Sequence, residues 1–180
     1  MRATKGTSVV SIRRLLQAAG TEDAVLAQLT PEDAELFRST LAVSWVCNDF
    51  MGRVFAVAGP ELFPGEAKPI RQLGRTIAQD NLTGVYRVML RIVSIPFAIE
   101  RAGSLWRTYN DTGDAVIERF GNEERARMTV TGYERFPDEC LEETAGYIEG
   151  VALLCGAKTA DAHPTRPSPT SFAFDVTWHS

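Results

Sequence analysis

One stretch, residues 69–111, limits what this chain can fold into more than any other. It carries the longest helical pattern of apolar side chains, interrupted once by Pro96. Proline cannot continue a helix without losing a hydrogen bond, but it suits a first turn. The stretch therefore predicts one helix that breaks near Ser94 and a second from Pro96 to Tyr109. Apolar residues recur along the first helix at Ile70, Leu73, Ile77, Ala78, Val85, Val88, Met89 and Ile92, and along the second at Ile99, Ala102, Leu105, Trp106 and Tyr109.

The residues before this stretch predict further helices. Thr30 precedes Pro31 and stands three residues before Asp33, which is typical of a capped helix start. Apolar residues at helical spacing from Ser44 to Val57 predict a buried helix that ends at Gly59-Pro60, with Asp49 and Arg53 paired on its outer side.

After Gly113 the period of the apolar pattern changes to two, which is typical of strands. We expect a hairpin, then a helix from Pro137 to Gly156, a strand over 158–163, a loop over 164–169 and a last strand over 172–178. The predicted fold class is α/β (α+β): N-terminal and central helices packed on a small, mainly antiparallel sheet with β-β-α-β-β order in the C-terminal half. We expect one structural domain, in which an N-terminal helical segment, 1–66, packs on a ligand-binding core, 67–180.

Composition excludes several classes of protein. The 180 residues carry a formal net charge of −4, which gives no general attraction to nucleic acid. The sequence contains no run of about 18 apolar residues, so it predicts no membrane-spanning helix. The N-terminus has no apolar segment typical of a signal peptide. Three widely spaced cysteines give no disulfide framework, so we expect a cytoplasmic protein.

No residue pattern predicts a reaction. Cys47 and Cys155 stand in segments with an apolar helical pattern, where cysteine behaves as a small hydrophobic residue. Cys140 stands at the start of a predicted helix, whose dipole would lower its thiol pKa. His163 and His179 lack ligand spacing for a metal. We predict no catalytic residue, no metal and no cofactor, and we expect that the chain is not an enzyme.

Charges and glycines mark the faces of the predicted helices. Glu139, Glu142, Glu143 and Glu149 read as a solvated acidic face of the helix that begins at Pro137, and its Gly146 and Gly150 would let another backbone approach closely. Arginines make the central helices basic on one side, and we favour pairing with acids elsewhere over an anionic ligand; they are Arg71, Arg75, Arg87, Arg91, Arg101 and Arg107.

Aromatic residues recur on the segments expected to face the sheet, at Tyr86, Phe97, Trp106, Tyr109 and Tyr147. Either they pack a core, or they line a pocket between helices and sheet.

Several short motifs occur in a particular order: Leu73-Gly-Arg-x-x-Ala78, Gly84-x-Tyr86, Leu105-Trp-x-x-Tyr109, Gly113, Gly146-Tyr-Ile-Glu-Gly150, Gly156-Ala157 and Phe174-x-Val-x-Trp178. In this order the chain resembles the 4-vinyl-reductase-type domain superfamily, and within it a bacterial group common in myxobacteria. The resemblance covers roughly Ala67 to Trp178.

The resemblance implies a small-molecule-binding or sensory module that signals through a partner protein, and homodimerisation through helices. We place its ligand, a small apolar or aromatic molecule, in a pocket lined by Tyr86, Met89, Trp106, Tyr109 and Tyr147. The cysteine set of zinc-holding relatives is broken here, and haem-binding relatives need a helical histidine, which neither His163 nor His179 provides. Two alternatives stay open: an assembly module that dimerises without a ligand, and an enzyme acting on a tetrapyrrole.

Overall fold

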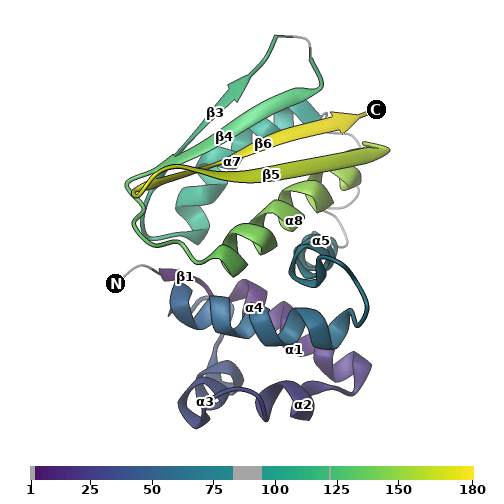
Figure 1. Ribbon diagram of the computed structural model, residues 1–180, viewed down its shortest axis with the longest axis vertical. Coiled ribbons are helices and arrows are strands. Elements are labelled where there is room, and N and C mark those ends of the chain that lie inside the picture. The colour runs from purple at the N-terminus through teal and green to yellow at the C-terminus, as the bar shows by residue number, and fades with distance from the viewer. Residues whose placement is uncertain (1–2, 83–94, 122) are drawn as a thin grey trace.

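The computed structural model describes residues 3–82, 95–121 and 123–180. The larger of two sheets has four strands. Figure 1 shows it at one end of the molecule, helices α1 to α4 at the other, and α5 and α8 between them. The helices are α1 (Thr7–Ala19), α2 (Glu22–Leu26), α3 (Pro31–Ser39), α4 (Asn48–Leu62), α5 (Pro69–Asn81), α7 (Ile95–Tyr109) and α8 (Asp138–Leu154). The strands are β1 (Ala3–Lys5), β2 (Trp45–Cys47), β3 (Asp114–Arg119), β4 (Arg125–Thr131), β5 (Thr159–Ser168) and β6 (Ser171–His179).

The larger sheet is antiparallel, with the order β3-β4-β6-β5, and its strands arise in the order β-β-α-β-β along the chain. Helix α7 packs against β3, and α8 packs against β5. The predicted fold class is confirmed. In the described part of the chain, no helix has the length and apolar character needed to cross a membrane.

Helix α5 packs on another helix, α8, and not on the sheet as predicted. The reason is a close crossing built on glycine, and the expected approach of a backbone to Gly146 and Gly150 is confirmed. A Cβ atom on Gly146 would lie 2.0 Å from the carbonyl oxygen of Arg71, and one on Gly74 would lie 2.0 Å from the carbonyl oxygen of Glu143. Only glycine, which has no Cβ atom, allows the two backbones to touch at these positions.

Residues 44–57 do not form one helix. Trp45–Cys47 forms β2, which pairs with Ala3–Lys5, and α4 then continues past Gly59 and Pro60 to Leu62. The distant partner strand decides the first difference, because short apolar segments suit either helix or strand. Proline near the end of α4 removes only one amide donor, so the helix completes its last turn.

The predicted loop over 164–169 is also mostly strand. Strand β5 runs through Pro164 and Pro167 to Ser168, with an irregular register between Thr165 and Ser168. It is an edge strand, where proline's missing amide can face away from the sheet.

The cap at Thr30 is confirmed, because its hydroxyl oxygen accepts from the amide of Asp33 at 3.2 Å. The expected ion pair between Asp49 and Arg53 was wrong, because Arg53 has a different partner. Arg53 instead donates two hydrogen bonds to the Asp33 carboxylate, at 2.6 and 2.9 Å, which holds the pKa of Asp33 below its usual value.

Helix α7 has nearly the predicted bounds, but part of its predicted buried stripe faces solvent. Trp106 is buried, whereas Leu105 is 52% exposed and Tyr109 41% exposed. Residues 83–94, where the first central helix was expected to end, lie outside the described residues.

The α5–α8 crossing gives the first prediction. We expect Gly146→Ala to lower the free energy of unfolding by about 3 kcal/mol, at the upper end of overpacking costs, because its methyl group would meet the backbone of α5. Urea denaturation measures this loss.

Gly52→Ala in α4 is the matched control. Its new methyl group would lie 3.1 Å from the side chain of Pro137, which is a milder contact, so the loss should stay below about 1 kcal/mol. A Gly146→Ala variant as stable as the parent protein would show that the crossing is not tight.

Candidate functional site

Polar side chains from α1, α5 and α8 lie close together, and two of them, Ser11 and Glu143, are buried. We call this group the polar seam; its members are Ser8, Ser11, Asn81, Glu143 and Tyr147. The Ser11 hydroxyl donates to the Asn81 side-chain oxygen at 2.7 Å, and Asn81 in turn hydrogen-bonds Tyr147. The seam lies beside the α5–α8 crossing, since Gly74 touches the backbone of Glu143.

Glu143 is the most unusual member of the seam. Its exposed fraction is only 7%, although a carboxyl group is costly to bury in charged form. Burial raises its pKa from 4.5 to about 7, and hydrogen bonds from Thr144 and Ser8 oppose that rise only in part. Near neutral pH the seam therefore holds a carboxyl group that can either donate or accept a hydrogen bond.

Tyr147 lies one turn further along α8. Burial raises its pKa to about 12, the nearby Tyr109 and Glu143 add to the rise, and the hydrogen bond with Asn81 opposes it. Its hydroxyl therefore keeps its proton at physiological pH and remains a hydrogen-bond donor.

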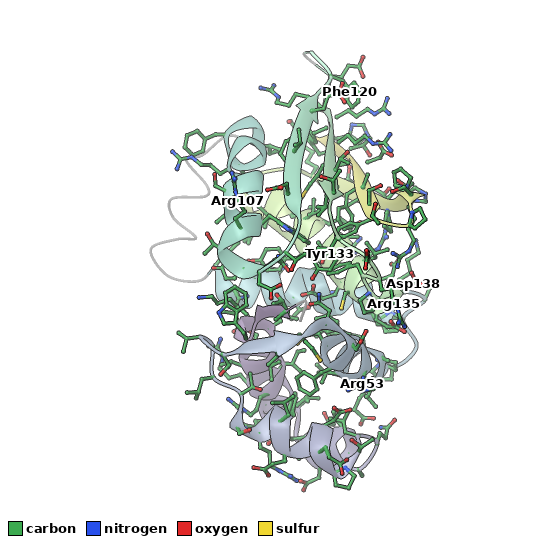
Figure 2. The ribbon with its side chains drawn as sticks, turned by 90° about the vertical axis from the view of Figure 1, so that its left-hand side faces the viewer. Arg53, Arg107, Phe120, Tyr133, Arg135 and Asp138 are labelled. Atoms are coloured by element: carbon green, nitrogen blue, oxygen red, sulfur yellow. The ribbon has the colours of Figure 1, made fainter. Side chains whose placement is uncertain are left out.

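An aromatic cluster forms the core beside α7. Five rings from α7, β6 and the segment between β4 and α8 belong to it: Trp106, Tyr133, Phe136, Phe172 and Phe174. Phe136 and Phe172 are stacked with centroids 4.6 Å apart, and the other pairs lie 5.0–6.0 Å apart, mostly edge to face. Figure 2 shows Tyr133 in the interior, between α7 and the strands. These separations are those of rings in direct contact.

The structure brings together some of the predicted pocket residues. Tyr109 lies near enough to Tyr147 to raise the pKa of Tyr147, although Tyr109 itself is 41% exposed. Trp106 belongs to the aromatic cluster, and its indole nitrogen donates to the carbonyl oxygen of Thr112 at 3.1 Å. Tyr86 and Met89 lie outside the described residues. The five-residue pocket stays a prediction.

The solvated acidic face expected on α8 was wrong for Glu143 and Glu149. Glu149 has no exposed surface; its carboxylate accepts from Arg75 at 2.7 Å, from Arg71 at 3.3 Å and from the amide of Ala162 at 3.0 Å. The expected pairing of arginines with acids is confirmed at Arg71 and Arg75. A signal for this burial was present in the sequence. Gly146 and Gly150 mark a helix-packing face. Glu143 stands three residues before Gly146 and Glu149 three residues after it, so both glutamates lie beside that face.

Burial raises the thiol pKa of two of the three cysteines, Cys140 and Cys155. Cys140 is buried, and its thiol lies 3.6 Å from the carbonyl oxygen of Asn48. The expectation that a helix dipole lowers its pKa was wrong, because burial and neighbouring acids raise the pKa of Cys140 well above its usual value.

A surface depression of about 240 Å³ lies between the start of α8 and β5, lined by Asp138, Leu141, Glu142, Pro164, Thr165 and Arg166. Its charged groups already pair: Arg166 with Asp138 at 2.5 Å, and Glu142 with Arg71 at 3.0 Å. Across residues 3–82, 95–121 and 123–180, no three His, Cys, Asp or Glu residues are grouped to hold a metal ion.

Solved structures with the same fold are H-NOX domains. An H-NOX protein mutant from K. algicida, with unliganded Fe(II), matches with a TM-score of 0.65 at 11% identity, over 98% of this chain and 97% of its own. A mutant of T. tengcongensis H-NOX gives 0.65 at 12% identity, over 98% of both chains. An oxygen-binding H-NOX domain related to soluble guanylate cyclases gives 0.62 at 10%, over 97% and 93%. No family model and no curated protein matches the sequence. These identities establish the fold alone.

The resemblance to the 4-vinyl-reductase-type superfamily was therefore wrong, since the matching structures are H-NOX domains. The motifs that carried it have structural reasons of their own. Gly146 and Gly150 serve the helix crossing, and Phe174, Val176 and Trp178 alternate into the core of β6. Such requirements recur in many mixed folds, so they do not distinguish families.

One matched structure concerns haem and porphyrin distortion, so we tested the fit of haem to this chain. Histidine is a common haem ligand, and both histidines of this chain stand on strands β5 and β6 with exposed side chains. The rings of the aromatic cluster are in contact with one another, which leaves no room between them for a flat macrocycle. These residues do not fit a histidine-ligated haem held in the cluster.

The buried carboxyl group gives the second prediction. Because folding raises the pKa of Glu143 from 4.5 to about 7, the folded state holds this proton more tightly than the unfolded chain. Its contribution to stability should be highest below pH 4.5 and should fall by about 3 kcal/mol as pH rises to 7 and beyond. Urea denaturation between pH 4.5 and 8 measures it.

Glu143→Gln should remove this part of the pH dependence, because the amide stays neutral. Glu139→Gln, on the same helix but less buried, should keep it. The assignment fails if Glu143→Gln has the same pH profile as the parent protein.

Proposed function

We propose that this chain is a small-molecule-binding sensor module that acts in signalling through a partner protein. The observation that carries the proposal is the polar seam. The buried Glu143 lies beside the half-buried Tyr147 and Asn81, and a site of few polar groups in apolar surroundings is typical of small-molecule recognition.

The structural neighbours support a sensor over a ligand-free assembly module. One of them is described as an oxygen-binding domain related to soluble guanylate cyclases. Because the histidines of this chain do not fit haem ligation, we propose a ligand that apolar contact and hydrogen bonds recognise, without an iron centre. This agrees with the small apolar or aromatic ligand expected from the sequence.

Within the proposed site the residues have distinct roles. The hydroxyl of Tyr147 donates a hydrogen bond to a polar atom of the ligand, and Tyr109 lies on its solvent side. Trp106, Tyr86 and Met89 contribute apolar surface. Glu143 near its pKa can accept from the ligand as a carboxylate or donate to it as a carboxylic acid, so binding would be coupled to proton release in the first case and to proton uptake in the second.

Native mass spectrometry of the purified chain tests this first. We expect a mass excess that disappears on denaturation and identifies a small molecule of the stated class. A mass equal to bare subunits, together with no binding of indole or p-cresol as probes, would overturn the proposal. A dimer of bare subunits would favour the assembly module.

Variants then locate the site with the same probes. Tyr147→Phe removes one buried hydrogen bond, worth about 1 kcal/mol, and should weaken p-cresol binding about fivefold in calorimetry. Trp106→Ala should also weaken it. Trp45→Ala is the control for Trp106, because Trp45 is 48% exposed and belongs neither to the seam nor to the aromatic cluster. Unchanged affinity in a folded Tyr147→Phe variant would place the ligand elsewhere.

A further inference from the structure

Helix α7 presents apolar side chains to solvent along one face. Phe97, Leu105 and Tyr109 are 46%, 52% and 41% exposed, and with Arg101 they stand at successive steps of four residues. Residues at this spacing form one stripe along a helix. Since α7 has 15 residues, the stripe follows a helix about 22 Å long.

The stripe continues onto the small sheet at the end of α7. Thr4 bridges to Asn110, its hydroxyl donates to the carbonyl oxygen of Tyr109 at 3.0 Å, and β1 pairs Lys5 with Trp45. Lys5 and Trp45 point to the same face of this small sheet, because opposed residues in a ladder point the same way. The contacts of Thr4 with Tyr109 and Asn110 bring that sheet against the end of α7.

The rim of this surface is held in place. Trp45 is 48% exposed, and the Lys5 ammonium lies 5.1 Å from the centre of its ring. The adjoining turn is closed by hydrogen bonds between Leu41 and Ser44, and the amide of Gly6 donates to the carbonyl oxygen of Ser44 at 2.9 Å. The backbone beside Trp45 is therefore held by hydrogen bonds.

Positive charge is interleaved with the apolar groups. The Arg101 guanidinium lies 5.0 Å from the centre of the Phe97 ring, and the Lys5 ammonium lies over the Trp45 ring in the same way. This cationic surface belongs to a chain with a formal net charge of −4. Charge complementarity therefore favours an acidic partner over a second copy's basic face.

We propose that this surface, which we call the α7 face (Phe97, Arg101, Leu105, Tyr109, Lys5 and Trp45), docks an acidic amphipathic helix of a partner protein. Apolar residues of that helix pack between Phe97, Leu105 and Tyr109, as in other helix-on-helix contacts, and its carboxylates pair with Lys5 and Arg101. This inference rests on the proposed function in one respect: it takes the docked helix to belong to the partner protein through which the chain signals. Tyr109 connects the two, because it belongs to the α7 face and lies near Tyr147 of the seam.

Site-specific photocrosslinking of the full chain in its native host tests this surface. A benzophenone amino acid replaces Leu105 in one variant and Val116 in the control, since Val116 is also an exposed aliphatic residue, at 65%, but lies on β3. We expect a crosslink from position 105 to one protein, mapped by mass spectrometry to an acidic segment with apolar residues at helical spacing.

Charge variants sharpen the test. Arg101→Glu in the Leu105-crosslinker chain should lower the yield about fivefold, whereas Arg101→Lys, which keeps the charge, should retain most of it. A crosslink to a second copy, to a basic segment, equally from position 116, or to nothing would overturn the proposal. The crosslinking test needs no ligand, so it can succeed when the search for a ligand fails. Likewise, a ligand can be found when no crosslink forms, so the failures of the two proposals are distinguishable.

Discussion

Close contact between the backbones of α5 and α8 is the constraint on which the rest of the structure depends. Gly74, Gly146 and Gly150 allow it, and α8 in turn packs on β5, so the helical N-terminal part is joined to the sheet through this crossing. A methyl group at Gly74 or Gly146 would overlap the opposite backbone. Because helices this close leave no room for water, every polar side chain beside them must find a partner within the protein.

Two buried carboxyl groups show how the protein meets that requirement in different ways. The Glu149 carboxylate accepts hydrogen bonds from Arg71, Arg75 and a backbone amide, which satisfies its oxygens. Glu143 has hydroxyl neighbours and no cation in its described surroundings, so burial raises its pKa to about 7. The first group ties α5 to α8 and β5, whereas the second is a titratable group at the junction, where the proposed ligand would bind.

The aromatic cluster explains why an H-NOX-like fold need not imply an H-NOX ligand. Trp106, Tyr133, Phe136 and Phe172 contact one another across the space beside α7, and the two histidines stand on exposed faces of strands. The fold supplies the same arrangement of helices and sheet, and side chains decide what can bind there. For this chain we propose a small organic molecule at the polar seam and a protein partner on the α7 face.

The sequence by itself determined the elements whose signals are local. The Thr30 cap, the start of α7, the alternation of β6 and the fold class follow from neighbouring residues along the chain. Tertiary structure decided the rest. Strand β2 needed its partner β1, proline-containing β5 needed a place at the sheet edge, and Glu143 became buried only when α5 met α8. Tertiary contacts also divided the apolar stripe of α7 between core and solvent. A periodic pattern defines a helix and its apolar side, but the burial of that side depends on which other elements pack against it.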